Sequence, residues 1–341
     1  MSRPSIAPAR WTPPTPVPTA PPAELVGLRV IETSGHGTED VLVRADGSVL
    51  TGVDDGRILA IDPATGHETQ IADTEGRPLG IEHHPAGGYV VCDAHRGLLR
   101  LLDDGTIEVL ADEYAGEYFV FCNNAAVAAD GTIYFTDSST VFDIEHWKAD
   151  LLEHRPTGRL FRRDPDGTVT LLVDDLAFAN GVALAADESF VVVAETAAYG
   201  LRRLWLTGQH AGRVEPFGSV LPGFPDNIST GADGNVWVAI ASPRDAALDL
   251  LLPRLPLLRR VVWSLPQRLQ PQPKMLIRVQ AYSPDGSLVH DVAGEHPRFG
   301  MPTGVRQSGD VVWLGSLESP TIAAFDLPRP GPSDGALGRP R

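Results

Sequence analysis

The sequence predicts an all-β fold, a six-bladed β-propeller, and this prediction rests on an internal repeat, on its turn residues and on composition. Six segments each run through an apolar strand to a turn and continue into a second apolar strand. They start at Glu39, Gly80, Asn123, Asn180, Asp226 and Thr303. Five carry a turn pair at the same spacing, as at Asp130-Gly131, and the sixth turns one residue earlier at Gly309-Asp310. Apolar, β-branched runs joined by such turns are typical of β-hairpins.

Composition and the sequence after each hairpin extend this repeat to a closed ring. Glycine (34) and proline (30) make up about 19% of the 341 residues, against an average near 12%, which favours many short strands. Most hairpins are followed by a further strand and turn, as in 56–66 and 158–167. A sheet of about four strands cannot bury both faces alone, so six such sheets are expected to stack around a channel. The strand-like segment 24–33 is expected to close the ring against the last blade.

The propeller is expected to span 24–327, with a proline-rich arm before it and a tail after it. The arm, 1–23, has eight prolines in its first 22 residues and no apolar run, so it is not a signal peptide. It is expected to be extended and polyproline-like, lying on the surface or disordered. The tail, 328–341, is rich in proline, glycine and arginine.

Two insertions interrupt the repeats, at 138–157 and 242–274. In the second, Leu248, Leu251, Leu252 and Leu255 follow helical spacing, and several arginines lie among them. We expect a lid of short amphipathic helices over the channel mouth. Two alternatives stay open: a helix on a membrane surface, and a helix that seals a strand edge at the side of the propeller.

Charge and cysteine content exclude several classes of function. The net charge of −16 argues against a nucleic-acid partner held through phosphates. Lys148 and Lys274 are the only lysines, which makes a Schiff-base or P-loop mechanism improbable on sequence grounds. Cys92 and Cys122 lie in apolar strands and are expected to be buried free thiols, and a cytoplasmic location is the simplest setting. No stretch is long and apolar enough to span a bilayer.

The starting positions of the repeats form a candidate metal site. The innermost strands of a propeller line its channel, so side chains at equivalent positions converge at one end of the axis. Four of the six starts, Glu39, Asn123, Asn180 and Asp226, offer only oxygen ligands, and two of these are carboxylates. Such a set suits Ca²⁺ rather than softer metals. Any one of these residues alone would be read as a turn former.

Longer stretches of the chain resemble a known family. GHGTEDVLV, NNAAVAADGTIYFTDSS, FANGVAL and PGFPDNIS are similar to the strictosidine-synthase-like branch of the gluconolactonase/paraoxonase propellers, a group that also includes the senescence-marker-protein-like proteins. The resemblance covers about 24–327 and implies one catalytic Ca²⁺ in the channel. By motif match the metal ligands would be Glu39, Asn123, Asn180, Asp226 and, as in paraoxonases, Asn227. Many relatives have Asp where this chain has Asn124, so no role of that Asp is carried over.

The same resemblance bears on catalysis. His95 lies within about a residue of a paraoxonase histidine proposed as a base, and Asp226 could act as base or nucleophile while touching the metal. Strictosidine synthase itself uses a glutamate just before the last blade, where this chain reads RFGMPTGV (298–305) without a carboxylate. Glu295 and His296 lie upstream, out of register.

We therefore expect a calcium-dependent hydrolase of the lactonase/esterase class, acting on a small neutral or hydrophobic substrate in the central channel. The alternatives are a propeller that binds a ligand or partner without turnover and, less favoured, a strictosidine-synthase-type condensing enzyme. Oligomeric state is left open by the sequence.

Overall fold

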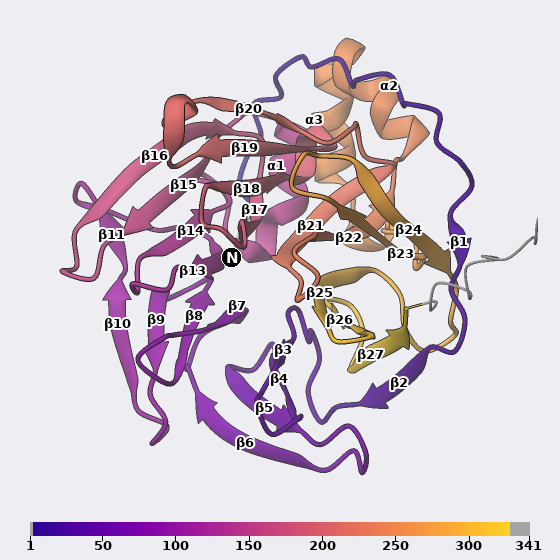
Figure 1. The fold of residues 1–341 in the computed structure, drawn as a ribbon. Coiled ribbons are helices and arrows are strands. Elements are labelled where there is room, and N and C mark those ends of the chain that lie inside the picture. The colour runs from indigo at the N-terminus through magenta and orange to yellow at the C-terminus, as the bar shows by residue number, and fades with distance from the viewer. Residues whose placement is uncertain (1–2, 328–341) are drawn as a thin grey trace, which may run out of the picture.

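The chain forms a six-bladed β-propeller, as the repeats predict. The structure, a computed structural model, describes residues 3–327, so the tail predicted at 328–341 lies outside the described residues. In each blade the first strand lies nearest the axis and the last lies at the rim (Figure 1).

Each of the first three blades is a four-stranded antiparallel sheet, and a two-stranded hairpin precedes the third. Blade 1 contains β3 (Leu42–Val43), β4 (Val49–Gly52), β5 (Arg57–Ile61) and β6 (Glu68–Asp73). Blade 2 contains β7 (Pro78–His83), β8 (Tyr89–Asp93), β9 (Gly97–Leu101) and β10 (Ile107–Ala111). The hairpin is β11 (Glu113–Tyr114) and β12 (Glu117–Tyr118). Blade 3 contains β13 (Cys122–Val127), β14 (Ile133–Asp137), β15 (Gly158–Arg163) and β16 (Val169–Leu176).

The last three blades follow the same plan, but two of them take strands from the N-terminal part of the chain. Blade 4 contains β17 (Ala179–Leu184), β18 (Phe190–Glu195), β19 (Gly200–Trp205) and β20 (Val214–Phe217). Blade 5 contains β21 (Gly223–Thr230), β22 (Val236–Pro243), β23 (Ile277–Tyr282), β24 (Leu288–Gly294) and the short β1 (Ala23–Glu24). Blade 6 contains β25 (Pro302–Ser308), β26 (Val311–Ser316), β27 (Thr321–Asp326) and β2 (Arg29–Glu32).

The ring closes as the sequence predicts, through the strand-like segment that precedes the first hairpin. β2 pairs with β27 in antiparallel register from Arg29 opposite Ala324 to Glu32 opposite Thr321. β1 adds a parallel pair to β24 at the rim of blade 5. The first and last parts of the propeller are thus joined by backbone hydrogen bonds.

Among the described residues the hydrophobic core is divided into eight clusters, six of which lie between two neighbouring blades, while one lies at the channel mouth and one lies between the arm and the helices. The cluster between blades 1 and 2, for example, joins Leu50 and Ile58 to Val91 and Leu99, all of them 0% exposed. Burying a side chain of this size contributes about 1.5–3 kcal/mol. No blade has a core of its own, so the ring is stable only when all six blades are in place.

The two insertions form the helices and lie on the channel. α1 (Trp147–Glu153), preceded by the 3₁₀ turn Ile144–His146, lies between β14 and β15. α2 (Ala246–Arg254) and α3 (Pro256–Ser264) lie between β22 and β23 and pack on one another at one side of the ring (Figure 1). None of the helices in the described part of the chain is long and apolar enough to cross a bilayer.

The proline-rich arm is extended and lies against these helices. Of the two expectations for it, an arm on the surface or a disordered arm, the structure shows the first for residues 3–23. Ala9 N donates to Glu153 O at 2.8 Å, and Trp263 Nε1 donates to Pro4 O at 2.7 Å. The ring of Trp11 packs against that of His154, with centroids 4.1 Å apart and the ring planes tilted by 34°. The arm therefore ties α1 and α3 together before the chain enters the propeller.

Close approach of the inner strands predicts that certain glycines cannot be replaced. A Cβ on Gly181 would lie 2.2 Å from Ile228 N and 2.6 Å from Asn227 Cα in the next blade. We expect Gly181→Ala to lower the free energy of unfolding by about 3 kcal/mol, measured by chemical denaturation, because backbone atoms cannot move aside as a side chain can. Gly200→Ala is the matched control, since its Cβ would meet only Ala198 O at 3.8 Å. Equal effects of the two variants would contradict this explanation.

Candidate metal centre in an apolar pocket

The inner strands carry a β-bulge where they reach the channel mouth, and the candidate ligands lie in these bulges. In β13 the pairing with β14 shifts between Cys122 and Ala125, which leaves Asn123 and Asn124 unpaired. The same shift leaves out Asn180-Gly181 in β17 and Asp226-Asn227 in β21. A bulge bends the strand and re-aims its side chains. It turns the first residue of each pair toward the axis.

The structure corrects one position of the repeat. In blade 2 the bulge contains Leu79 and Gly80, and the turn glycine equivalent to Gly131 is Gly87, so Leu79 rather than Gly80 is equivalent to Asn123. The adjacent Gly87 and Gly88 both have positive φ, and this double glycine hides the register in the sequence. The first bulge positions, with Glu39 and Thr303 from blades 1 and 6, line one pocket: Glu39, Leu79, Asn123, Asn180, Asp226 and Thr303.

The second bulge positions alternate between a polar side chain and glycine around the ring: Asp40, Gly80, Asn124, Gly181, Asn227 and Gly304. Asp40 Oδ2 accepts from Ile81 N at 3.1 Å, and Asn124 Oδ1 accepts from Val182 N at 3.1 Å. In both cases the acceptor belongs to one blade and the donor to the next. Asn124 thus supports the neighbouring strand through its side-chain amide.

Four buried oxygens in this region have no hydrogen-bond partner: Glu39 Oε2, Asn123 Oδ1 and Asn180 Oδ1, whose residues line the pocket, and Asn227 Oδ1, whose residue lies behind the lining and bonds to Glu39. The amide nitrogens of the three asparagines are all used, since they donate to Ser138 Oγ at 2.9 Å, Thr196 Oγ1 at 3.1 Å and Glu39 Oε1 at 2.9 Å. Buried acceptors without a donor are rare and destabilising, so four in one place require an explanation.

Two of the amide orientations are fixed by their partners. Thr196 Oγ1 donates to Pro225 O at 2.7 Å, so it can only accept from Asn180, whose nitrogen must face it. The ionised carboxylate of Glu39 can only accept, so in that form it faces the nitrogen of Asn227. The unpaired oxygens of Asn180 and Asn227 therefore follow from the hydrogen bonds.

The electrostatics of the site favour a cation. Burial, and secondarily the charge of Asp226, holds the pKa of Glu39 well above its usual range, and burial raises the pKa of Asp226 to about 7. Two carboxylates held close together in a buried site repel one another, and a bound cation reverses that penalty. Residues 3–327 contain no group of three or more His, Cys, Asp or Glu side chains placed to hold a metal, so any ion must also use the amide oxygens. The residues present fit Ca²⁺, which takes six to eight oxygen ligands.

The pocket above these oxygens is largely apolar. Its wall includes Phe121, Phe178, Phe224 and Met301, each two residues before a first bulge position, and this F-x-N/D spacing was a signal in the sequence that our sequence analysis missed. Phe178 and Met301 adopt positive φ values of 61° and 52°, which is uncommon for such side chains and directs them into the pocket wall.

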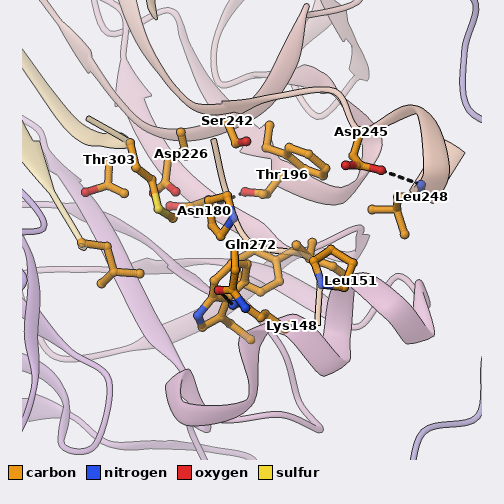
Figure 2. A pocket seen from close by; sticks show the side chains of 18 of the residues that line it. Lys148, Leu151, Asn180, Thr196, Asp226, Ser242, Asp245, Leu248, Gln272 and Thr303 are labelled. Atoms are coloured by element: carbon orange, nitrogen blue, oxygen red, sulfur yellow. Dashed lines mark hydrogen bonds between the residues drawn. The ribbon is translucent and has the colours of Figure 1, made fainter. Parts of the chain in front are cut away.

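The 242–274 insertion covers the pocket, as expected of a lid. Leu248 and Leu251 of α2 and Val262 of α3 line it, together with Leu151 of α1 (Figure 2). The outward sides of α2 and α3 expose Leu250, Leu257 and Val261 by 53–74%. The rim of blade 5 is covered by β1 rather than by these helices, so the edge-sealing alternative does not describe the insertion.

The structure separates His95 from the other candidate residues. His95 does not line the pocket; its Nε2 lies 2.8 Å from Glu145 Oε1, and its side chain is 43% exposed. Its role as a base stays a prediction, and in this arrangement it has no direct contact with the oxygen cluster. Cys92 and Cys122 are both buried free thiols, as expected.

Comparison with known proteins shows the family. A model described as strictosidine synthase matches residues 123–209, and one described as strictosidine synthase-like, N-terminal, matches 19–61. Protein STRICTOSIDINE SYNTHASE-LIKE 6 of Arabidopsis thaliana is 33% identical over 317 residues, covering 89% of this chain and 82% of the relative. The adipocyte plasma membrane-associated protein of Rattus norvegicus is 30% identical over 335 residues, covering 88% and 85%. The chain therefore belongs to the strictosidine synthase-like family.

Solved structures show the same fold at lower identity. A gluconolactonase of Xanthomonas campestris superposes with a TM-score of 0.63 at 19% identity, covering 90% of this chain and 91% of the other. The calcium-binding protein regucalcin of Agrobacterium tumefaciens gives 0.63 at 13% identity, covering 91% and 96%. At these identities the likeness establishes the propeller.

The oxygen cluster predicts one metal per chain. The double variant Glu39→Gln with Asp226→Asn removes both carboxylates and should lose the bound ion, measured by elemental analysis after dialysis against Ca²⁺ and then buffer. A control with the same charge change, Glu145→Gln with Asp245→Asn, should retain it. Equal metal content in the native chain and both variants would contradict the site.

Proposed function

We propose that the chain is a calcium-dependent hydrolase of the lactonase/esterase class, acting in the central pocket. The observation that supports this most is the set of four unpaired buried oxygens beside Asp226 at the bottom of an apolar pocket. A purely structural site would have its acceptors satisfied by protein donors.

The ion would be held by Glu39, Asn123, Asn180, Asp226 and Asn227. The amide nitrogen of Asn227 also orients Glu39. When bound, Ca²⁺ supplies Lewis-acid polarisation of a carbonyl and stabilisation of the negative charge that develops on its oxygen. Asp226 is the most exposed of the candidate ligands at 9%, and it faces the pocket. Its carboxylate would take a proton from attacking water and return it to the leaving alkoxide oxygen. Alternatively, it would attack the carbonyl carbon and expel the alkoxide, and water would then hydrolyse the resulting mixed anhydride, which releases the acid, frees Asp226 and supplies the proton for the alkoxide.

The apolar wall supports this chemistry by excluding water. Phe121, Phe178 and Phe224 surround the oxygens, and the lid residues Leu248 and Leu251 lie opposite. In such surroundings charge–dipole interactions are stronger than in water. The wall also supports an ester or lactone substrate with an apolar body.

The comparisons support hydrolysis at the level of the fold class. The neighbours include a gluconolactonase and a calcium-binding protein, whereas the names of the closer relatives, strictosidine synthase-like and adipocyte plasma membrane-associated proteins, state no hydrolytic activity. The segment before the last blade contributes Met301 and Thr303 to the pocket, while Glu295 is exposed and lies outside it. This arrangement supports hydrolysis over a condensation that needs a glutamate there.

One observation favours binding without turnover as the second candidate. No histidine is among the described residues that line the pocket, so Asp226 would have to be metal ligand and proton acceptor at once. A propeller that only binds its ligand needs no such double role.

A panel of lactones and aryl esters, assayed with and without EDTA, separates the two candidates. We expect turnover that EDTA abolishes and that Asp226→Asn lowers by about 100-fold or more, because a positioned base contributes at least that much. Asp130→Asn is the control: Asp130 does not line the pocket, it accepts from Thr132 N at 2.8 Å in a blade turn, and asparagine can accept the same bond. A chain that binds Ca²⁺ stoichiometrically but is inert across the panel would favour the binding candidate.

A further inference from the structure

The two lysines of the chain both line the pocket. Lys148 and Lys274 are the only lysines among 341 residues, and no arginine is among the described lining residues. Lys148 is half-buried on α1, whereas Lys274 is exposed near the mouth. The pocket therefore has two lysines in its lining as well as the cluster of oxygens and a further carboxylate, Asp245.

Lys148 is held by neutral groups rather than by a counterion. Its Nζ donates to Gln272 Oε1 at 2.9 Å and lies 5.2 Å from the ring centroid of Trp147. Among residues 3–327 no carboxylate forms an ion pair with it, although the charge of Glu318 acts on it from a distance. An ammonium group has three donors, and one of them is used here.

Gln272 is held in place by the backbone of the lid. Its Nε2 donates to Gln267 O at 2.8 Å and Gln270 O at 3.0 Å, which fixes Oε1 toward Lys148. Burial lowers the pKa of Lys148, so removing its charge from water is not compensated by the groups around it. Lys148 is half-buried and its hydrogen bond to Gln272 is exposed to solvent, so an anion in the pocket can pair with the donors of the ammonium group that remain.

In Figure 2 Lys148 lies below and away from Asp226 and Thr303, and Gln272 lies between Lys148 and Asn180. Apolar side chains, among them Leu151, Phe178 and Phe224, complete the wall. A ligand that satisfies both sides needs an apolar body and a negatively charged group away from the oxygen cluster.

We propose that the pocket binds an amphiphilic anion, whose carboxylate or phosphate pairs with Lys148 while its apolar body packs against Leu151, Phe178 and Phe224. This rests on the proposed function only in treating the pocket as the substrate site. It replaces the neutral substrate expected from the sequence with an ester or lactone that carries a separate acidic group.

Direct binding tests the proposal without requiring turnover. The full chain, loaded with one equivalent of Ca²⁺, is titrated calorimetrically with octanoate, octyl phosphate, octanol and octylamine. The two anions should bind about tenfold or more tightly than octanol, because a hydrogen bond to a charged group is worth at least that factor. The ratio between octanoate and octyl phosphate identifies the acid that is preferred.

Three variants distinguish an anion site from the alternative that Lys148 only joins α1 to the lid through its hydrogen bond to Gln272. Lys148→Met keeps the apolar stem and should weaken octanoate by about tenfold while changing octanol less than twofold. Lys148→Arg should retain the preference for anions. Gln272→Glu should weaken octanoate, because a carboxylate beside Lys148 competes with the ligand, although it would strengthen a tether.

The proposal is overturned if the anions bind no better than octanol, if octylamine binds best, or if Lys148→Met weakens octanoate and octanol equally. Octanoate binding that depends on Asp226 and not on Lys148 would also overturn it, since the carboxylate would then lie at the oxygen cluster. If the ester panel shows no turnover but Lys148-dependent anion binding persists, the proposed hydrolase fails and this inference stands.

Discussion

The convergence of six inner strands on one axis is the constraint on which the rest of the molecule depends. At the channel mouth the second bulge position of a blade lies close to the backbone of the next blade. Only three of the six blades have room for a side chain there, so Asp40, Asn124 and Asn227 alternate with Gly80, Gly181 and Gly304. Side chains of Asp40 and Asn124 bond to the backbone of the next blade. The bulges that relieve this crowding turn the first positions of the pairs toward the axis. Crowding of the backbone and assembly of the oxygen cluster are therefore two results of one arrangement.

The unpaired oxygens of the cluster destabilise the fold when no ion is bound, and neighbouring side chains hold them in place. Ser138 and Thr196 accept hydrogen bonds from the amide nitrogens of Asn123 and Asn180, which leaves the amide oxygens facing inward. Glu39 accepts from the amide nitrogen of Asn227 in the same way. Around the cluster the phenylalanine wall and the lid residues form an apolar lining. The N-terminal arm, by tying α1 to α3, fixes two of the elements that form that wall. Such preorganisation suits an ion whose ligands must be in place before it binds.

Features that repeat along the sequence could be predicted from it, whereas contacts that depend on how the insertions fold could not. The repeats predict six blades and the closure of the ring by β2. They also predict that four residues with oxygen ligands lie together, because equivalent positions in a propeller meet at the axis. The register of blade 2 was wrong by one residue, since Gly87 and Gly88 offer two equally good turns and a bulge has no signature of its own in sequence. The insertions decide where His95 and Lys148 lie: Glu145 engages His95 outside the pocket, and Gln272 meets Lys148 within it. Neither contact follows from spacing along the chain.

Calcium titration of the EDTA-treated native chain tests the central claim most directly, because it asks whether the unpaired oxygens bind a cation without assuming a substrate. The account predicts one site per chain with a Kd below ~100 µM, and a rise in Tm that increases with free Ca²⁺, since an ion that binds only the folded state stabilises it. Absence of stoichiometric binding together with an unchanged Tm at millimolar Ca²⁺ would contradict it, and the unpaired oxygens would then need another explanation.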